Sequence, residues 1–123
     1  MTEYIAGKCN IGAAEIHRRY QVAIIGGVLY LILALSFILA QVSISLRLTI
    51  FLPAMMCTVG YIQARRKFCL AYGFMGVFNF GAKGSTHQVI DPVALAADRA
   101  YALKILSLAI LPAIVMTAVV LAL

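Results

Sequence analysis

Long apolar stretches without a formal charge dominate the chain. They cover residues 20–46, 48–64, 68–82 and 105–123, which are 27, 17, 15 and 19 residues long. A helix that crosses a bilayer needs about 20 predominantly apolar residues, so the first and the last stretch are long enough. The second becomes long enough when polar side chains at its ends reach the headgroups. The pattern therefore predicts an all-α integral membrane protein with three transmembrane helices, at about 21–41, 46–64 and 102–122.

The same pattern predicts a single membrane domain, residues 1–123. Its parts are expected to be a juxtamembrane collar, a helical hairpin, an inner loop and a long third helix, at residues 1–20, 21–64, 65–91 and 92–123. Asn10 is expected to cap the N-terminus of the first helix, because its side chain can accept bonds from free backbone N–H groups. Asp91 followed by Pro92 predicts the start of the third helix in the same way.

The third apolar stretch is too short to cross a bilayer, and it follows three cations, Arg65, Arg66 and Lys67. Its glycines weaken a long helix, and its aromatic side chains favour the membrane interface. We therefore expect residues 68–81 to form an interfacial or re-entrant segment, with the three cations at the lipid phosphates. Protein must cover any non-helical backbone at this depth, because lipid cannot bond its polar groups, and the collar is expected to provide that cover.

Composition and charge exclude the other broad classes. Hydrophobic residues make up 64% of the 123 residues, which leaves too little polar surface for a soluble globule. The net charge is +6, but the cations flank apolar stretches and do not cover a polar face, so nucleic-acid binding is not expected. With a cytoplasmic N-terminus, nine of the ten Lys and Arg residues lie inside and only Arg47 lies outside. This asymmetry predicts a cytoplasmic N-terminus, an external C-terminus and membrane lipids as partners.

Three cysteines are candidates for chemistry. Cys57 falls inside the second predicted helix, where a thiol packs as a small apolar side chain. Cys9 and Cys69 are predicted on the cytoplasmic side beside cations, which lower a thiol pKa, so each is either reactive, a ligand, or packed at a helix-end junction. A zinc site of Cys9, Cys69, His17 and His87, or an iron–sulfur site, is an alternative, although no spacing matches a short metal motif. No cofactor is therefore predicted, and bound lipid is a candidate ligand.

Two segments carry a resemblance to a known family. NIGAAEIHRRYQVAIIGG, residues 10–27, resembles the opening of the YgaP-type inner-membrane domain, a small two-helix module found alone or fused to a rhodanese. FCLAYGFMG, residues 68–76, is similar to the cysteine motif after that module's second helix, with Leu70 in place of a proline. The resemblance covers about residues 9–81 and is carried by Asn10, Gly12, Glu15, Arg18 or Arg19, Gly26 or Gly27, Cys69, Tyr72, Gly73 and Gly76.

The resemblance implies a hairpin whose two inner ends meet. Asn10, Glu15 and Arg18 or Arg19 would then lie beside the loop that holds Cys69. In rhodanese-linked members the module accompanies a sulfur-transferring domain, which this chain of 123 residues does not include, and a third helix is added here. The expected location is the bacterial inner membrane.

The leading functional hypothesis is a non-enzymatic accessory or scaffold subunit of a larger membrane complex, or a homo-oligomer. Small residues in the predicted helices allow close helix approach. The first alternative is a thiol-, persulfide- or metal-handling membrane protein that uses Cys9 and Cys69. The second is a small transporter or channel formed on oligomerisation. The residues expected to support the structure or face partners are Asn10, Gly12, Glu15, Arg18, Arg19, Tyr72, Gly73 and Gly76.

Overall fold

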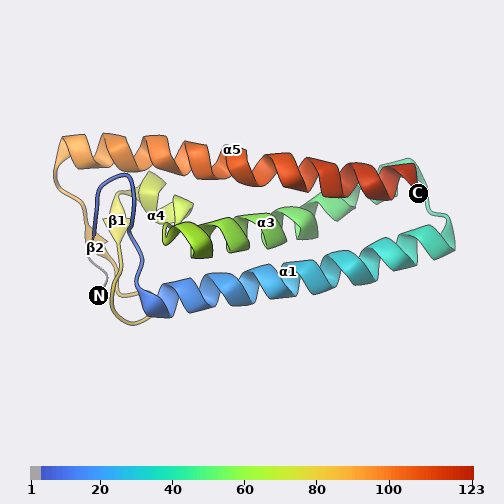
Figure 1. Ribbon diagram of the computed structural model, residues 1–123, viewed down its shortest axis with the longest axis horizontal. Coiled ribbons are helices and arrows are strands. Elements are labelled where there is room, and N and C mark those ends of the chain that lie inside the picture. The colour runs from blue at the N-terminus through green and yellow to red at the C-terminus, as the bar shows by residue number, and fades with distance from the viewer. Residues whose placement is uncertain (1–3) are drawn as a thin grey trace.

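The computed structural model of the protein describes residues 4–123. Three long helical segments make up most of the chain, and short elements join them (Figure 1). In chain order the elements are α1 (Ala13–Ala40), α2 (Ile44–Arg47), the 3-10 helix η1 (Leu48–Ile50), α3 (Phe51–Arg66), α4 (Leu70–Met75), β1 (Val77–Phe78), β2 (His87–Gln88) and α5 (Pro92–Ala122).

The prediction of three membrane-crossing helices is confirmed at the level of length and composition. Ala13–Ala40, Ile44–Arg66 and Pro92–Ala122 are each long and apolar enough to cross a membrane. The structure is mostly helical, in line with the all-α prediction, and the expected inner loop contains β1 and β2, an antiparallel pair of two-residue strands. Gly76, with a φ of +76°, ends α4 directly before β1, and the loop between the two strands contains a second left-handed glycine, Gly84, with a φ of +82°.

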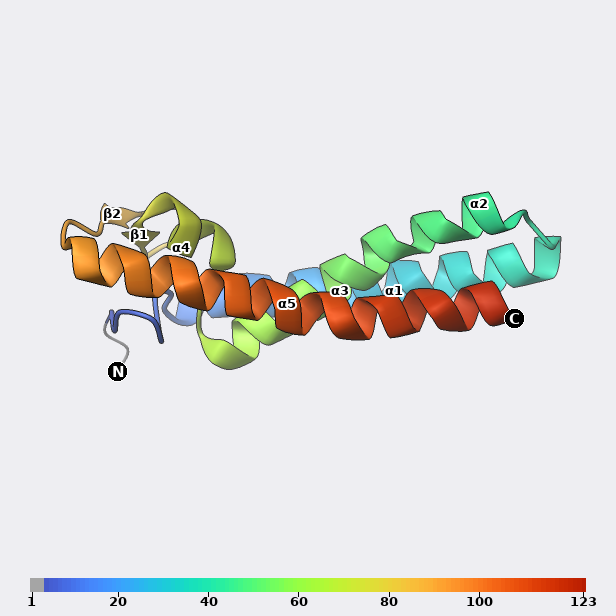
Figure 2. The same cartoon turned by 90° about the horizontal axis from the view of Figure 1, so that it is seen from above.

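The three long segments alternate in direction, so the remaining parts of the chain gather at the two ends of the bundle (Figures 1 and 2). One end holds the N-terminal segment, α4 and the two strands, and we call residues 4–12 and 67–91 the cap. The other end holds the α1–α2 turn and the C-terminus (Figure 2). Helix α3 lies between α1 and α5 and packs against both of them. The cap is therefore built from segments that are far apart in the sequence.

The expected start of the third helix is confirmed, and that of the first helix is wrong. Asp91 accepts a hydrogen bond from the backbone N–H of Val93 at 3.1 Å and caps α5. Helix α1 begins at Ala13 with Gly12 as its N-cap, and no side chain caps it. Asn10 is not the N-cap of α1, because its side chain forms hydrogen bonds with the backbone of Cys69 instead.

Helices α1 and α3 cross with their backbones in contact. A Cβ atom on Gly26 would lie 2.6 Å from the backbone nitrogen of Cys57, and one on Gly60 would lie 2.7 Å from that of Ala23. Real Cβ atoms do not approach backbone atoms so closely, so both positions require glycine. Small residues that allow helix backbones to touch are typical of membrane helix pairs.

Arg47 lies at the end of the bundle opposite the cap, where its side chain joins two segments of the chain. We expected this side chain to reach out toward the headgroups, but it is buried, with a relative exposure of 6%. Its Nε donates to the carbonyl of Val42 at 3.1 Å, and its Nη1 donates to the carbonyl of Val120 at 3.0 Å. The last carbonyls of a helix lack partners within the helix and carry partial negative charge, so a guanidinium there stabilises the C-terminus of α5.

Candidate functional site

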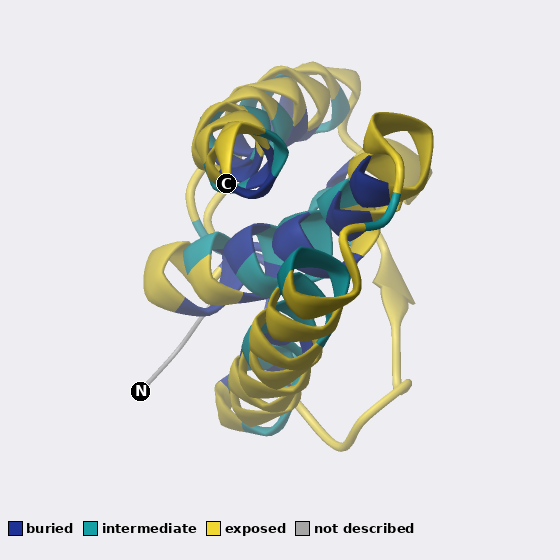
Figure 3. Ribbon diagram, turned by 90° about the vertical axis from the view of Figure 1, so that its right-hand side faces the viewer, coloured by how far each residue is buried: buried dark blue, intermediate teal, exposed yellow. Residues whose placement is uncertain are grey.

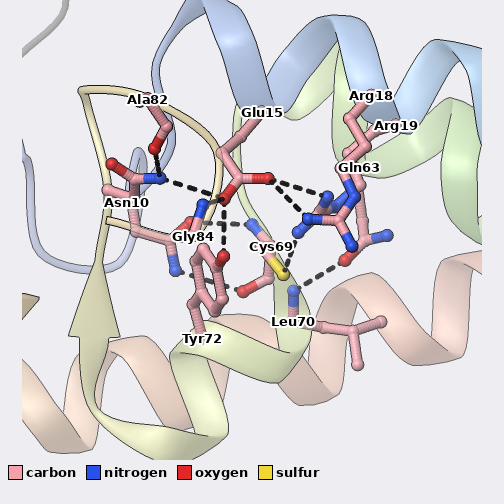
Figure 4. Close-up of polar contacts among 11 residues, drawn as sticks. Asn10, Glu15, Arg18, Arg19, Gln63, Cys69, Leu70, Tyr72, Ala82 and Gly84 are labelled. Atoms are coloured by element: carbon pink, nitrogen blue, oxygen red, sulfur yellow. Dashed lines mark hydrogen bonds and ion pairs between the residues drawn. The ribbon is translucent and has the colours of Figure 1, made fainter. Parts of the chain in front are cut away.

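Glu15 lies at the centre of a polar cluster inside the cap. Its side chain is fully buried in the first turn of α1. Its Oε1 accepts a hydrogen bond from Nη1 of Arg19 at 3.1 Å and forms an ion pair with Nη1 of Arg18 at 3.7 Å (Figure 4). Arg18 and Arg19 follow Glu15 by three and four residues, so one turn of helix brings them to the same carboxylate. Arg19 is the inner partner, because its side chain is only 11% exposed and that of Arg18 is 51% exposed.

The second oxygen of Glu15 binds the rest of the cap. It accepts hydrogen bonds from the hydroxyl of Tyr72 at 2.5 Å, from Nδ2 of Asn79 at 3.0 Å and from the backbone N–H of Gly84 at 3.3 Å. An ionised carboxylate has about four acceptor sites and no proton to donate, so five surrounding donors suit the charged form. Burial and the hydrogen bond to Glu15 both raise the pKa of the Tyr72 hydroxyl, which keeps it a donor. Glu15 therefore joins α1 to α4 and to the β1–β2 loop.

Arg19 also contacts the sulfur of Cys69. The distance between Nη2 of Arg19 and Sγ of Cys69 is 2.9 Å, and the guanidinium carbon lies 5.7 Å from the centre of the Tyr72 ring (Figure 4). Cys69 is almost completely buried, with a relative exposure of 2%. Cations next to a cysteine sulfur are typical of reactive thiols. The contact would stabilise negative charge on this sulfur.

Two buried amides hold the backbone around Cys69. Nδ2 of Asn10 donates to the Cys69 carbonyl at 3.1 Å, and Oδ1 of Asn10 accepts from the Cys69 N–H at 2.7 Å. Oε1 of Gln63 accepts from the N–H of Leu70 at 2.8 Å. The chain leaves helical geometry here because Lys67 takes a left-handed conformation, with a φ of +55°. The two amides satisfy backbone groups that lipid would leave without partners.

Asn79 is a central member of the cluster that the sequence analysis did not identify. It is fully buried, and its Nδ2 donates to Glu15 and to the carbonyl of Ala82. Its backbone pairs with the N-terminal segment, through Gly12 N–H to the Asn79 carbonyl at 2.8 Å and Asn79 N–H to the Asn10 carbonyl at 2.9 Å. The one feature of the sequence that could have identified Asn79 is its position as a polar residue between Phe78 and Phe80, within an apolar run.

Three comparisons find nothing similar to this chain. No protein-family model, no curated protein and no solved structure matches it. The resemblance to the YgaP-type domain over residues 9–81 therefore stays a prediction. The arrangement expected from it is nevertheless present, since Asn10, Glu15 and Arg19 lie beside the loop that holds Cys69.

The glycines of the expected site have structural roles within the chain. A Cβ on Gly12 would lie 2.9 Å from the Cα of Phe80, and one on Gly73 would lie 2.8 Å from the ring of Phe68. Gly76 has the left-handed conformation that ends α4. Of the eight residues expected to support the structure or face partners, Arg18 alone is exposed. The contacts that we describe for this group are therefore internal.

Cys9 and the two histidines do not join the cluster around Cys69. The Cys9 thiol contacts the carbonyl of Ile11 at 3.8 Å. Burial raises the pKa of the Cys9 thiol and outweighs the lowering by the hydrogen bond to Ile11 and by Lys67, so the cation acts in the expected direction but does not decide the net shift. His17 is exposed on α1, and His87 is exposed in β2 beside the ring of Phe78. Within residues 4–123, no three His, Cys, Asp or Glu side chains meet in a group that could hold a metal ion.

A second buried carboxylate, Asp98 of α5, fastens the N-terminal segment. Its oxygens accept hydrogen bonds from the Tyr4 hydroxyl at 2.5 Å and from the N–H of Gly7 at 2.7 Å. Burial and this bond raise the pKa of the Tyr4 hydroxyl. The Tyr4 ring also stacks on Phe78, with 4.8 Å between the ring centres. Sequence spacing gave no sign of this contact, which joins residues more than 90 positions apart.

Proposed function

We propose that this protein is a non-enzymatic integral membrane protein that serves as an accessory or scaffold subunit, either in a larger membrane complex or as a homo-oligomer. We place it in the bacterial inner membrane with the cap in the cytoplasm. The cation distribution supports this orientation, because Arg47 lies at the opposite end and the other nine cations lie toward the cap end.

The outer face of α1 is the observation that carries this proposal. Of its 28 residues, only Glu15, Ala23 and Gly26 are buried. The most apolar part of α1 is less buried than the most apolar parts of Ile44–Arg66 and Pro92–Ala122 (Figure 3). Its exposed large apolar residues are Ile24, Ile25, Val28, Leu29, Leu31, Ile32, Leu35 and Leu39. A helix from a partner or from a second copy would pack against this face.

Several small residues of the long helices pack within the chain and are not free to contact a partner. Gly26 and Gly60 form the α1–α3 crossing. Ala54, Ala109 and Ala113 are buried. Two others, Ser36 and Ala118, are exposed. The proposed interface therefore depends on the large side chains of α1 and not on a close crossing of small residues.

Replacing Leu31 by tryptophan tests this interface. Leu31 is 66% exposed, so Leu31→Trp leaves the packing within the chain intact and places a bulky ring where a partner helix would lie. We expect the fraction of protein found in the complex to fall about tenfold, which corresponds to about 1.4 kcal/mol. Native mass spectrometry of gently solubilised membranes measures that fraction.

Val115→Trp is the matched control, because Val115 is 62% exposed on α5. It should leave the complex unchanged. Wild-type protein that runs as a monomer, or equal effects of the two substitutions, would contradict the proposal.

A second candidate function, thiol or persulfide handling, is favoured by one contact. The guanidinium of Arg19 lies 2.9 Å from the Cys69 sulfur and would stabilise a persulfide anion there. In such a step a small persulfide passes its outer sulfur to the Cys69 thiol and leaves as a thiol.

Cysteine substitutions test the second candidate. After exposure to a low-molecular-weight persulfide, the wild-type Cys69 peptide should gain the mass of one sulfur atom, at least about tenfold more often than the Cys57 peptide, because Arg19 contacts the Cys69 sulfur. Cys69→Ser should abolish this gain, and Cys57→Ser should leave it unchanged. Mass spectrometry of the digested protein measures both. No gain at Cys69 would remove this candidate.

A further inference from the structure

Two cations from different helices meet at one tyrosine where α3 ends. Arg66 is the last residue of α3. Its Nη1 forms no ion pair with a carboxylate of residues 4–123 and donates a hydrogen bond to the Tyr101 hydroxyl of α5 at 3.3 Å. Nζ of Lys104, one turn further along α5, lies 6.0 Å from the centre of the same ring. Arg66 and Lys104 are both exposed. The structure thus brings two positive charges and one hydroxyl together at the α3–α5 junction.

No acid among residues 4–123 neutralises this pair. The ion pairs of that part of the chain join Arg18 and Arg19 to Glu15. Asp98 is buried against Tyr4 and Gly7, and Asp91 caps α5. Two cations that lie beside the same tyrosine and lack a carboxylate partner favour an external anion.

The junction lies at the depth of lipid headgroups. Residues 101 and 120 of α5 are separated by roughly 28 Å along the helix at 1.5 Å per residue. The hydrocarbon core of a bilayer is about 30 Å thick. Arg47 joins the carbonyl of Val120 to that of Val42, whose neighbours Gln41 and Ser43 are polar and exposed, which places one polar boundary there. The second boundary then falls at Tyr101, at the cap end.

Packing against the core fixes the position of the Tyr101 ring. Its ring packs edge-to-face on Phe68, with 4.8 Å between centres, and Phe68 is fully buried with Ala102 and Ile105 in the core. The Tyr101 hydroxyl, on a fixed ring that Arg66 and Lys104 both approach, is preorganised for an anion, which lowers the entropy lost on binding. Leu103, directly before Lys104, is 56% exposed and offers apolar surface to an acyl chain.

We propose that Arg66, Tyr101 and Lys104 form a binding site for the phosphate of an anionic phospholipid in the leaflet at the cap end. Phosphate oxygens accept from the guanidinium, the ammonium and the hydroxyl, and the acyl chains lie along the apolar surface of α5. Basic sites between membrane helices bind acidic headgroups in this manner. The site is independent of the α1 face and of Cys69.

Lipid titration of the full chain in detergent, followed by native mass spectrometry, tests the site. Wild-type protein should bind phosphatidylglycerol more tightly than phosphatidylcholine with the same acyl chains. Arg66→Gln combined with Lys104→Gln should weaken phosphatidylglycerol binding about 10- to 30-fold. This corresponds to about 1 kcal/mol of lost electrostatic attraction for each removed cation. Lys8→Gln combined with Lys83→Gln removes the same charge from exposed positions of the cap and should have little effect.

Four further outcomes would contradict the proposal in whole or in part. Equal losses in the two double variants would show a general attraction to the charged end, and equal binding of the two lipids would show that the headgroup is not recognised. Displacement of phosphatidylglycerol by millimolar inorganic phosphate would identify a site for a soluble anion. Tyr101→Phe, which removes only the exposed hydroxyl and keeps the ring on Phe68, should weaken binding a few-fold without unfolding, and an unchanged affinity would exclude the tyrosine from the site.

Discussion

Glu15→Gln should destabilise the protein by about 3–5 kcal/mol, the range found when one partner of a buried ion pair is removed. The glutamine keeps the size of the side chain but removes the charge that pairs with Arg19 at 3.1 Å. Its amide would also turn donor protons toward the Tyr72 hydroxyl or the Asn79 amide, which themselves donate to Glu15. The apparent melting temperature should fall by at least about 10 °C.

A thiol-reactive fluorescent dye in a detergent melt measures this change, because Cys69 is buried in the folded cap. Asp91→Asn is the control. It removes the same formal charge from an exposed helix cap, where asparagine caps about as well as aspartate. Equal melting temperatures for the two variants would show that Glu15 does not hold the cap together.

Gly60→Ala should separate α1 from α3 at their crossing. The added Cβ would lie 2.7 Å from the backbone nitrogen of Ala23 and 2.9 Å from the carbonyl oxygen of Arg19, so one helix has to move. Overpacking of this kind costs about 1–3 kcal/mol. The movement would also shift Arg19 away from Cys69, so the dye should react with Cys69 faster even below the melting transition.

Gly27→Ala provides the comparison for this substitution. A Cβ on Gly27 meets only the Cys57 sulfur, at 3.4 Å, which is a side-chain atom that can adjust. This variant should melt within about 2 °C of the wild type, as is usual for substitutions that meet no strain. A Gly60→Ala protein that melts like Gly27→Ala would contradict the close crossing.

The three long apolar helices were predictable because hydrophobic length is a local property. Apolar runs of sufficient length leave few other structures open to the backbone in lipid. The start of α5 was equally readable, since the Asp91 cap acts on Val93, two residues away. The Asn10 cap failed although the local signal was the same. A partner 59 residues away, the backbone of Cys69, takes its side chain instead.

The buried polar contacts of the protein could not be predicted from neighbouring residues. Asn79 and Asp98 are fully buried, yet nothing in their neighbouring residues states which donors they meet. Arg47 was expected at the headgroups because a lone cation beside an apolar run usually reaches the surface. Its burial follows from the position of the C-terminus of α5, whose free carbonyls become available only once the bundle forms.

The sequence by itself determined that three segments are long and apolar enough to cross a membrane, where these long helices lie and that the cations favour one end. These features follow from composition and from interactions within one or two helical turns. Only the tertiary structure decided which polar side chains are buried together, which glycines must stay glycine and which cations lack a counter-ion. The physical reason is that a buried charge or a missing Cβ depends on atoms brought close by folding, and those atoms belong to distant parts of the chain.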